Sequence, residues 1–195
     1  VTPDYSGNDF VHIARAVIPI SPTFIYLVNS EDSTPSIVYR KSTDGGQSWG
    51  AAIEIGTVPV GNMNGFGAWF DKWTPGNSGT IIHVTWYDHV SFKWYYRSLD
   101  TSTDTLGTLR EIKAFTGGLG TAPIWIIRAR DGTLYAGGYA GTTPTGFRKS
   151  TDEGVNWSVD LASFHDVDFR VDIDEKRFFL LPGNDADPAD VWVVM

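Results

Sequence analysis

The chain has 195 residues, a formal net charge of −8 at pH 7, 42% hydrophobic residues and no cysteine. It is long enough to bury a hydrophobic core, and the lack of cysteine excludes disulfides, thiolate metal sites and cysteine nucleophiles. Its 23 acidic against 15 basic residues argue against a nucleic acid partner. No apolar run approaches the ~20 residues that span a bilayer, so we expect no membrane partner. No motif indicates a cofactor.

Short runs of β-branched and aromatic residues alternate with polar, glycine-bearing turns, which is typical of β-hairpins. Two strands open each repeating unit, and in chain order they are Phe10–Ala16 and Phe24–Val28, Phe66–Asp71 and Ile81–Tyr87, and Pro123–Arg128 and Leu134–Tyr139. A hairpin follows each pair, over residues 36–55, 93–112 and 145–162. The C-terminal part offers Phe169–Asp172, Arg177–Leu181 and Val191–Met195. No window shows helical periodicity.

A serine near the end of the third strand marks the repeat, at Ser42, Ser98 and Ser150. Four strands, which we name A to D, at a period of about 50 residues describe one blade of a β-propeller. We therefore predict an all-β fold that is a propeller or a segment of one. Its blade units cover roughly 9–57, 66–114, 121–165 and, incompletely, 168–195, so about four blades are present.

Residues 42–49 read STDGGQSW and residues 150–157 read STDEGVNW. Both resemble the Asp-box, S-x-D-x-G-x-[ST]-W, the BNR repeat of sialidases and of other propellers. An aspartate here accepts backbone hydrogen bonds within the C–D turn, the glycine permits a positive φ, and the tryptophan opens strand D and buries its ring. We expect this structural role for Ser42, Asp44, Gly46 and Trp49, and for Ser150, Asp152, Gly154 and Trp157.

The other copies depart from the motif. Asn156 stands in the Ser/Thr place, and the middle copy keeps only Ser98 and Asp100, with its glycine displaced to Gly107. We expect these two turns to be looser. In sialidase-like folds the Asp-boxes lie on the face opposite the active site, so the resemblance implies that Asp44 and Asp152 are structural rather than catalytic.

Alternating strand direction puts the C–D turns and A–B loops at one end of each blade and the B–C and D–A loops at the other. Propellers usually bind ligands at the B–C and D–A end. There the pairs Asp88-His89 and His165-Asp166 are candidates for acid–base catalysis, with ordinary solvated loop polarity as the alternative. The cluster Asn184–Asp187 offers oxygen ligands for Ca²⁺ but lacks an EF-hand pattern, and we predict no metal site.

Four residues are candidates for contact with a ligand. Arg170 follows Phe169 at the start of an A strand, matching the first two positions of the sialidase motif [FY]-R-I-P. Trp69, Trp73 and Tyr87 are aromatic rings of the kind that stack on sugars. The alternative is packing between blades: side chains alternate along a strand, so Trp86 and Tyr87 point to opposite faces and at least one of them is core.

The resemblance implies an extracellular or cell- or virion-surface protein, with no signal peptide in this chain, that recognises glycans as sialidases and related glycoside hydrolases do. The sialidase tyrosine–glutamate pair belongs to late blades, so we expect no complete catalytic set here. The alternative is a non-enzymatic structural or adhesion propeller of a phage or bacterial surface protein that binds a protein partner. A segment of a propeller that does not close into a ring leaves an apolar sheet face exposed to solvent at each end. We therefore expect missing blades of a larger, six-bladed ring, closure as a four-bladed ring, or pairing with a second copy.

Overall fold

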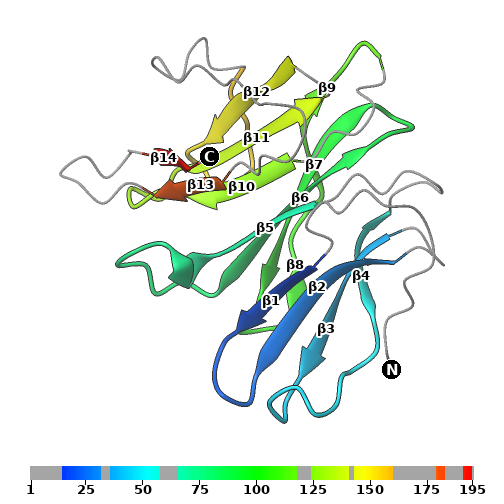
Figure 1. The fold of residues 1–195 in the computed structure, drawn as a ribbon, viewed down its shortest axis with the longest axis vertical. Coiled ribbons are helices and arrows are strands. Elements are labelled where there is room, and N and C mark those ends of the chain that lie inside the picture. Colours follow the sequence, from blue (N-terminus) through cyan, green and yellow to red (C-terminus); the bar gives the residue numbers. More distant parts are fainter. Residues whose placement is uncertain are drawn as a thin grey trace.

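The computed structural model describes residues 15–31, 36–57, 66–117, 124–140, 143–159, 179–182 and 191–194. Within these ranges the chain is all-β, apart from the single 3₁₀ turn η1 (Asp71–Trp73), and its strands form four antiparallel sheets (Figure 1). The expectation of an all-β fold is therefore confirmed. In the described part of the chain, no helix has the length and apolar character needed to cross a membrane.

The sheets are built from strands that follow one another in the chain. The first contains β1 (Arg15–Pro19), β2 (Ile25–Glu31), β3 (Ser36–Ser42) and β4 (Ile53–Thr57). The second contains β5 (Phe66–Phe70), β6 (Ile81–Asp88) and β7 (Lys93–Asp100), with β8 (Thr105–Leu106) and β9 (Arg110–Ala114) both paired to β7. The third contains β10 (Ile124–Arg128), β11 (Leu134–Ala140) and β12 (Thr143–Ser150). Finally, β13 (Phe179–Pro182) pairs with β14 (Val191–Val194).

Most predicted strands are found, with differences at their ends. The first strand was expected at Phe10–Ala16; residues 10–14 lie outside the described residues, and the strand ends at Pro19 instead of Ala16, because its pairing with β2 continues that far. In the third sheet no fourth strand occurs in the described residues up to Val159. The predicted strand Phe169–Asp172 lies outside the described residues.

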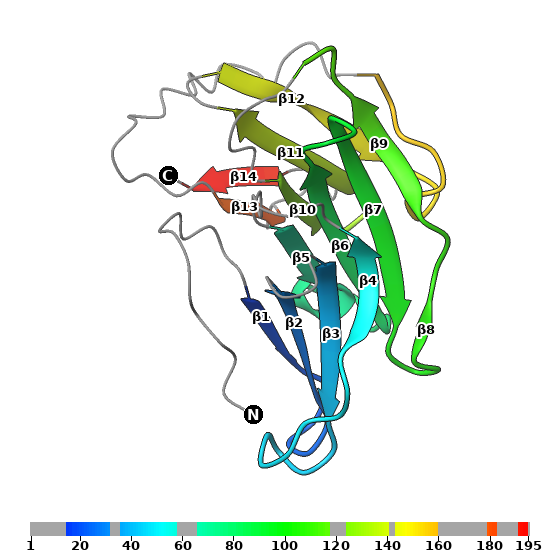
Figure 2. The same cartoon turned by 90° about the vertical axis from the view of Figure 1, so that its right-hand side faces the viewer.

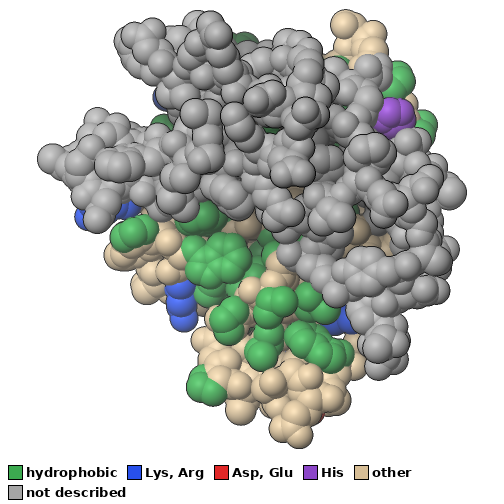
Figure 3. Space-filling view, viewed as in Figure 1, with side chains coloured by type: hydrophobic (Ala, Val, Ile, Leu, Met, Phe, Trp, Pro, Cys, Tyr) green, Lys and Arg blue, Asp and Glu red, His purple; other side chains and the backbone are tan. Residues whose placement is uncertain are grey.

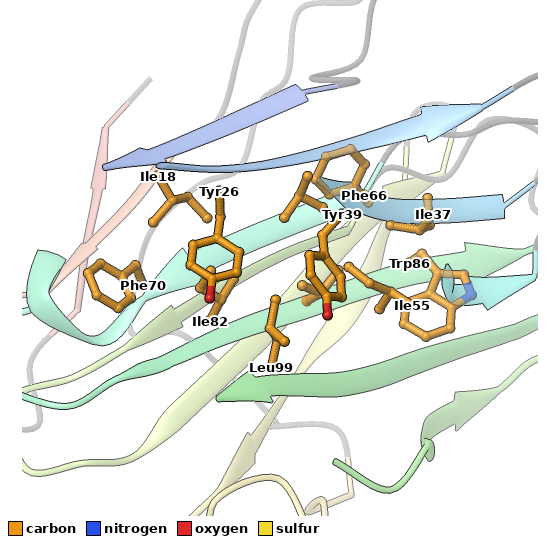
Figure 4. Close-up of a cluster of buried hydrophobic side chains, with 12 residues drawn as sticks. Ile18, Tyr26, Ile37, Tyr39, Ile55, Phe66, Phe70, Ile82, Trp86 and Leu99 are labelled. Carbon is orange, nitrogen blue, oxygen red and sulfur yellow. The ribbon is translucent and has the colours of Figure 1, made fainter. Parts of the chain in front are cut away.

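The first two sheets face each other across a hydrophobic core. Figure 4 shows side chains from β1–β4 and from β5–β7 pointing toward one another. The buried members are Ile18, Tyr26, Val28, Ile37, Tyr39 and Ile55 from the first sheet, and Phe66, Phe70, Ile82, Val84, Trp86 and Leu99 from the second. Apolar burial of this kind is the main force that holds two sheets together.

The opposite face of the second sheet packs on the third sheet, and Figure 2 shows the sheets in succession. This second core contains Tyr87, Trp94, Tyr96 and Ile112 with Ile124, Ile126, Leu134 and Ala136. Trp86 therefore belongs to one core and Tyr87 to the other, as strand alternation predicts. The second sheet has two buried faces, which explains why β6 reads as an almost continuous apolar run.

An arginine on the third strand bridges each sheet to the one before it. Arg97 donates from Nη1 to the carbonyl oxygen of Ile55 at 2.8 Å, and Arg148 donates from Nη1 to that of Ile112 at 2.9 Å. Ile55 and Ile112 lie on the last strand of the preceding sheet in each case. Arg40 has the same place on β3, where it pairs with Glu31 at 2.6 Å. The order of the strands therefore repeats along the chain, and so does the arginine–carbonyl hydrogen bond at the two interfaces between sheets.

These arginines correct the expected alignment of the middle copy. Arg40 and Arg148 stand two residues before the Asp-box serines, so Arg97 identifies Leu99, and not Ser98, as the equivalent of Ser42 and Ser150. The strand register agrees, because Ile25 pairs with Ser42 and Ile82 pairs with Leu99. The hydrophobic leucine faces the first sheet in the core. The middle copy has therefore lost the box serine altogether.

Hydrophobic side chains also reach the surface. Figure 3 shows them gathered on the side where β1, β2 and β5 lie in Figure 1. The exposed large hydrophobic residues of this part of the chain include Val17 on β1, Phe24 just before β2 and Trp73 in η1.

Candidate functional site

Backbone hydrogen bonds define two ends of the sheets. At one end the C–D turn of the second sheet meets the A–B loop, where the Thr101 N–H donates to the Thr80 carbonyl at 2.9 Å. At the other end the Phe115 N–H donates to the Phe92 carbonyl at 2.9 Å, which joins the start of the D–A loop to the B–C loop. We name these the Asp-box end and the B–C end. Their separation agrees with the expected alternation of loops.

The first Asp-box is a turn closed around one carboxylate. Asp44 accepts through Oδ1 from the Ser48 N–H at 2.9 Å and through Oδ2 from the Ser48 hydroxyl at 2.5 Å. The Ser42 hydroxyl donates to Asp44 Oδ1 at 2.8 Å and accepts from the Gly46 N–H at 2.8 Å. The hydrogen bond from the Ser48 hydroxyl is the main reason that the pKa of Asp44 is lowered to about 2. Both oxygens of this carboxylate therefore accept hydrogen bonds from within the turn and stabilise it.

The second Asp-box has the same network in spite of its asparagine. The backbone N–H and the side-chain amide of Asn156 donate to the two oxygens of Asp152 at 2.9 and 2.7 Å, and these bonds lower the pKa of Asp152. Ser150 donates to Asp152 at 2.8 Å and accepts from the Gly154 N–H at 2.9 Å. The amide of Asn156 thus replaces the serine hydroxyl bond for bond. The expectation of a looser turn here is wrong.

The two box tryptophans are not equivalent. Neither opens a strand as expected, since β4 begins only at Ile53 and no strand follows Trp157 in the described residues. The Trp49 side chain is 38% exposed, whereas Trp157 packs edge-on against Tyr96 with ring centroids 5.5 Å apart. Only the second box therefore has its ring seated against a preceding sheet.

The middle C–D turn is held differently from the two boxes. Asp100 accepts from the backbone N–H and the hydroxyl of Ser102 at 2.9 and 2.7 Å, and Asp104 has a positive φ of 56°. The Tyr26 hydroxyl of the first sheet donates to Asp104, and Lys41 pairs with Asp104 at 2.6 Å. This turn therefore contacts the first sheet instead of being loose.

The pair Asp88-His89 does lie at the B–C end, but Asp88 is occupied by its own loop. Its carboxylate accepts from the Val90 N–H at 2.8 Å, from the Ser91 N–H at 3.2 Å and from the Ser91 hydroxyl at 2.6 Å. The His89 ring instead meets the edges of Tyr87 and Phe92, at centroid distances of 5.9 and 6.1 Å. This geometry favours a rigid loop over a catalytic acid–base pair.

Aromatic rings form a layered cluster at the B–C end. Trp94 and Tyr87 are buried beneath Phe115, with ring centroids 5.0 and 6.0 Å from it. Phe92 and Phe115 are partly exposed, as is His89. Because Tyr87 is only 1% exposed, it supports the outer rings and does not itself offer a face to a ligand. We name Tyr87, His89, Phe92, Trp94 and Phe115 the B–C aromatic cluster.

Polar side chains stand beside this cluster. Lys113 lies over the ring of Phe115, with Nζ 4.9 Å from the centroid. Lys93 pairs with Glu111 at 2.7 Å near the cluster. Aromatic rings with charged neighbours provide both stacking area and hydrogen-bonding groups, the combination that polar organic ligands such as sugars need.

The remaining candidates lie elsewhere. Trp69 and Trp73 contact each other edge to face at 5.6 Å, at the Asp-box end and therefore away from the B–C aromatic cluster. Trp69 donates from Nε1 to Thr74 at 3.0 Å, whereas Trp73 is 39% exposed. His165, Asp166, Arg170 and the cluster Asn184–Asp187 lie outside the described residues. The sequence candidates are thus not brought together into one site.

A buried polar cluster, which sequence reasoning missed, joins the second and third sheets. Asp71 Oδ1 lies 3.0 Å from His83 Nε2, and His83 Nδ1 lies 2.8 Å from the Tyr96 hydroxyl. Arg128 donates to Asp71 at 2.9 Å and forms a two-pronged ion pair with Glu153 at 3.0 and 2.5 Å. We name these five residues the junction cluster.

The members of the junction cluster differ in burial, and this affects the pKa of Asp71. The side chains of His83 and Asp71 are only 1% and 2% exposed, whereas Glu153 is 59% exposed. Burial alone would raise the pKa of Asp71, but the hydrogen bond and charge of His83, together with Arg128, outweigh it and lower that pKa. One feature of the sequence indicates a buried polar contact here. His83 lies inside the apolar run IIHVTWY, and a polar side chain buried in such a strand needs a hydrogen-bonding partner.

No model of a protein family matches the chain, and no curated protein matches it significantly. Among the described residues, no group of three or more His, Asp or Glu side chains could hold a metal ion.

Proposed function

We propose that the chain is part of a β-propeller that binds carbohydrate without cleaving it, and that the B–C aromatic cluster is the contact surface. The propeller reading is supported by sequential antiparallel sheets that stack face to face. It is supported further by an arginine that recurs at both interfaces. The sequence contributes the two Asp-boxes, which resemble those of sialidase-like propellers.

The observation that carries the proposed binding function is the position of three partly exposed rings at the end opposite the Asp-boxes. Phe115 packs on the buried rings of Tyr87 and Trp94, and His89 packs on Tyr87. Phe92 packs on His89, so contacts within the protein hold the outer rings in place before a ligand arrives. A pre-ordered aromatic surface loses little conformational entropy on binding. Sugars expose apolar C–H faces that such rings can cover, and the neighbouring charged groups can bond to sugar hydroxyls.

We propose further that this chain does not hydrolyse the glycosidic bonds of the carbohydrate it binds. Glycoside hydrolysis needs two carboxyl groups flanking the bond that breaks. Asp88 accepts three hydrogen bonds from its own loop, and Glu111 is paired with Lys93. Neither carboxylate is arranged as a general acid. A fluorogenic sialoside assay on this chain should give no turnover, and robust turnover would contradict this part of the proposal.

Glycan binding can be tested with a matched pair of variants. A glycan array identifies a sugar, and calorimetry then compares Phe115→Ala with Trp49→Ala. Both variants remove a partly exposed ring, but at opposite ends of the sheets. We expect about tenfold weaker binding for Phe115→Ala, from the loss of ~1.4 kcal/mol of stacking, and unchanged binding for Trp49→Ala. Equal effects of the two variants, or no binding anywhere on the array, would contradict the proposal.

A second function, contact with protein, is favoured by the exposed hydrophobic residues near β1, β2 and η1 (Figure 3). Exposed apolar groups that lie together mark interaction surfaces. This function would replace the first if the glycan array is blank and the chain self-associates in solution in a way that Val17→Thr reduces.

A further inference from the structure

The loop between β6 and β7 holds a bulky side chain in an unfavourable backbone conformation. Asp88 pairs with Lys93 across the hairpin, so residues 89–92 form the whole loop. Phe92, the last of them, has a positive φ of 55°. This left-handed region suits glycine, and a bulky residue found there is a true outlier. A phenylalanine therefore occupies a position at which the backbone favours glycine.

Other strained residues of this chain have a side chain with a specific contact. In the described part of the chain, two more residues with a β-carbon have a positive φ, Asp104 and Glu153. The Asp104 carboxylate pairs with Lys41 at 2.6 Å, and the Glu153 carboxylate pairs with Arg128 at 2.5 Å. The remaining described residues with a positive φ are glycines. Because strain elsewhere accompanies a bound side chain, we expect the Phe92 side chain to have a partner as well.

The loop itself keeps Phe92 in this conformation. The Asp88 carboxylate accepts from the Val90 N–H, the Ser91 N–H and the Ser91 hydroxyl, which lie directly before Phe92. The Phe92 carbonyl oxygen accepts from the Phe115 N–H at 2.9 Å. A strained backbone persists only where its surroundings hold it. These four hydrogen bonds hold the loop on both sides of the strained residue.

Contacts within the protein use only part of the Phe92 side chain. The ring packs at the edge of the second core and meets the His89 ring edge to face, with centroids 6.1 Å apart. Phe92 is nevertheless only partly buried. Val90, at the tip of the same loop, is 65% exposed and extends the apolar surface. The exposed part of the Phe92 ring thus faces solvent at the B–C aromatic cluster, where the proposed glycan binds.

We propose that glycan binding at the B–C aromatic cluster depends on the Phe92 ring, and that the loop holds this ring in place at a cost to stability, with Asp88 as a positioning residue. This inference rests on the glycan binding proposed above and adds the residue that decides its affinity. It also gives Asp88 a role other than acid–base catalysis, since its carboxylate acts on the loop backbone. Strained residues are found at binding sites where the position of a side chain matters more than local stability.

The strain is tested by exchanging glycine and alanine at two positions. Both residues remove the ring, so they differ only in the β-carbon. Urea denaturation should give a higher midpoint for Phe92→Gly than for Phe92→Ala, because glycine tolerates the positive φ. Phe115 has no positive φ, so the order should reverse there, with Phe115→Ala above Phe115→Gly. A midpoint for Phe92→Ala that equals or exceeds that of Phe92→Gly would overturn the proposed strain.

The role of the ring is tested on the glycan array with a concentration series of each labelled variant. Phe92→Gly should need about tenfold more protein for half-maximal binding than the unsubstituted chain, although its backbone is relieved. Phe92→Leu keeps an apolar side chain without a flat ring and should be weakened as well. Phe92→Tyr keeps the ring and should bind more tightly than Phe92→Leu. Binding of Phe92→Gly or Phe92→Leu at the level of the unsubstituted chain would overturn the proposal.

The same array separates this inference from the function on which it rests. If Phe115→Ala weakens binding and Phe92→Gly does not, the dependence on Phe92 is wrong and glycan binding at the cluster stands. If the unsubstituted chain binds no glycan, both are wrong.

Asp88→Ala tests the positioning role. We expect weaker binding to the array, because the loop no longer holds Phe92 in place. In the Asp88→Ala background, the denaturation midpoint of Phe92→Gly should exceed that of Phe92→Ala by less than it does in the unsubstituted background, since a loop without its carboxylate can relax. A merely structural carboxylate would leave that difference unchanged. Unchanged binding of Asp88→Ala, or an unchanged difference, would overturn the role of Asp88.

Discussion

The two Asp-box glycines allow a matched test of the packing at the second box. Gly46 and Gly154 hold the same motif position and have similar positive φ values, 92° and 82°. Their surroundings differ. A β-carbon on Gly46 would meet its nearest atoms at an ordinary 3.8 Å, whereas one on Gly154 would lie 2.1 Å from Cε1 of Tyr96. Substitution by alanine therefore separates backbone strain from steric conflict.

The expected magnitudes follow from these distances. Gly46→Ala should cost about 1–2 kcal/mol, because alanine is disfavoured at positive φ. Gly154→Ala adds the displacement of a buried tyrosine, about 1–3 kcal/mol, and the loss of a hydrogen bond of Tyr96, about 1 kcal/mol. Tyr96 cannot move aside easily, since it is stacked on His83 and bonded to it. We expect a total of about 3–6 kcal/mol for Gly154→Ala.

Urea denaturation of the two variants and the unsubstituted chain, followed by tryptophan fluorescence, provides the measurement. The change in unfolding free energy should be at least about 2 kcal/mol larger for Gly154→Ala than for Gly46→Ala, as the two additional contributions require. Equal losses would refute the reasoning, because they would mean that Tyr96 is not fixed against the turn. A larger loss for Gly46→Ala would refute it equally.

Three further predictions concern charge and the joints between sheets. Asp71→Asn should destabilise the chain by about 3 kcal/mol at pH 7, because it breaks a buried ion pair. The pKa of Asp71 is lowered, so its contribution is present above the ordinary aspartate pKa and is lost as the pH falls through the lowered value. Acid titration of unfolding should therefore be flatter in the variant. Ser48→Ala should raise the pKa of Asp44 from about 2 toward its ordinary value, as measured by carbon NMR, and an unchanged pKa would contradict the assigned cause. Arg97→Met should cost about 1–3 kcal/mol in thermal unfolding by leaving the Ile55 carbonyl without its donor, and an unchanged melting temperature would show that this bridge is not stabilising.

The strands were largely predictable because their signals are local. Alternating apolar residues and glycine-bearing turns identified the hairpins around Asp44 and Asp152, and the motif predicted the backbone hydrogen bonds that both aspartates accept. The error at the first strand is of the usual kind, since a strand ends where pairing with its neighbour stops and the sequence does not record this. The looser turn expected at Asn156 is a similar error. Asparagine differs from the serine of the motif, but its amide donates to Oδ2 of Asp152 just as the Ser48 hydroxyl donates to Oδ2 of Asp44.

The candidate site was less predictable, because it depends on which side chains face each other across sheets. The sequence predicts Tyr87 as a ligand contact, but Phe115 packs over its ring and Tyr87 lies in the core. No local pattern places His83 in a cluster: its partners come from η1 and β7 and, through Asp71, from Arg128 of β10. Those partners are far apart in sequence, so no local pattern could have assembled them.

Residues within a few positions of one another specify the all-β class, the order of the hairpins and the backbone hydrogen bonds of both Asp-box aspartates, so local sequence was enough to predict these features. Packing between sheets is needed to see that Leu99 replaces a box serine and that aromatic rings gather at the B–C end. It is also needed to see that Asp71, beside the buried His83, pairs with Arg128 of the third sheet. Each of these depends on the face a side chain presents and on what the next sheet places opposite it. A shift of one residue in strand register reverses that face, and local sequence does not fix it.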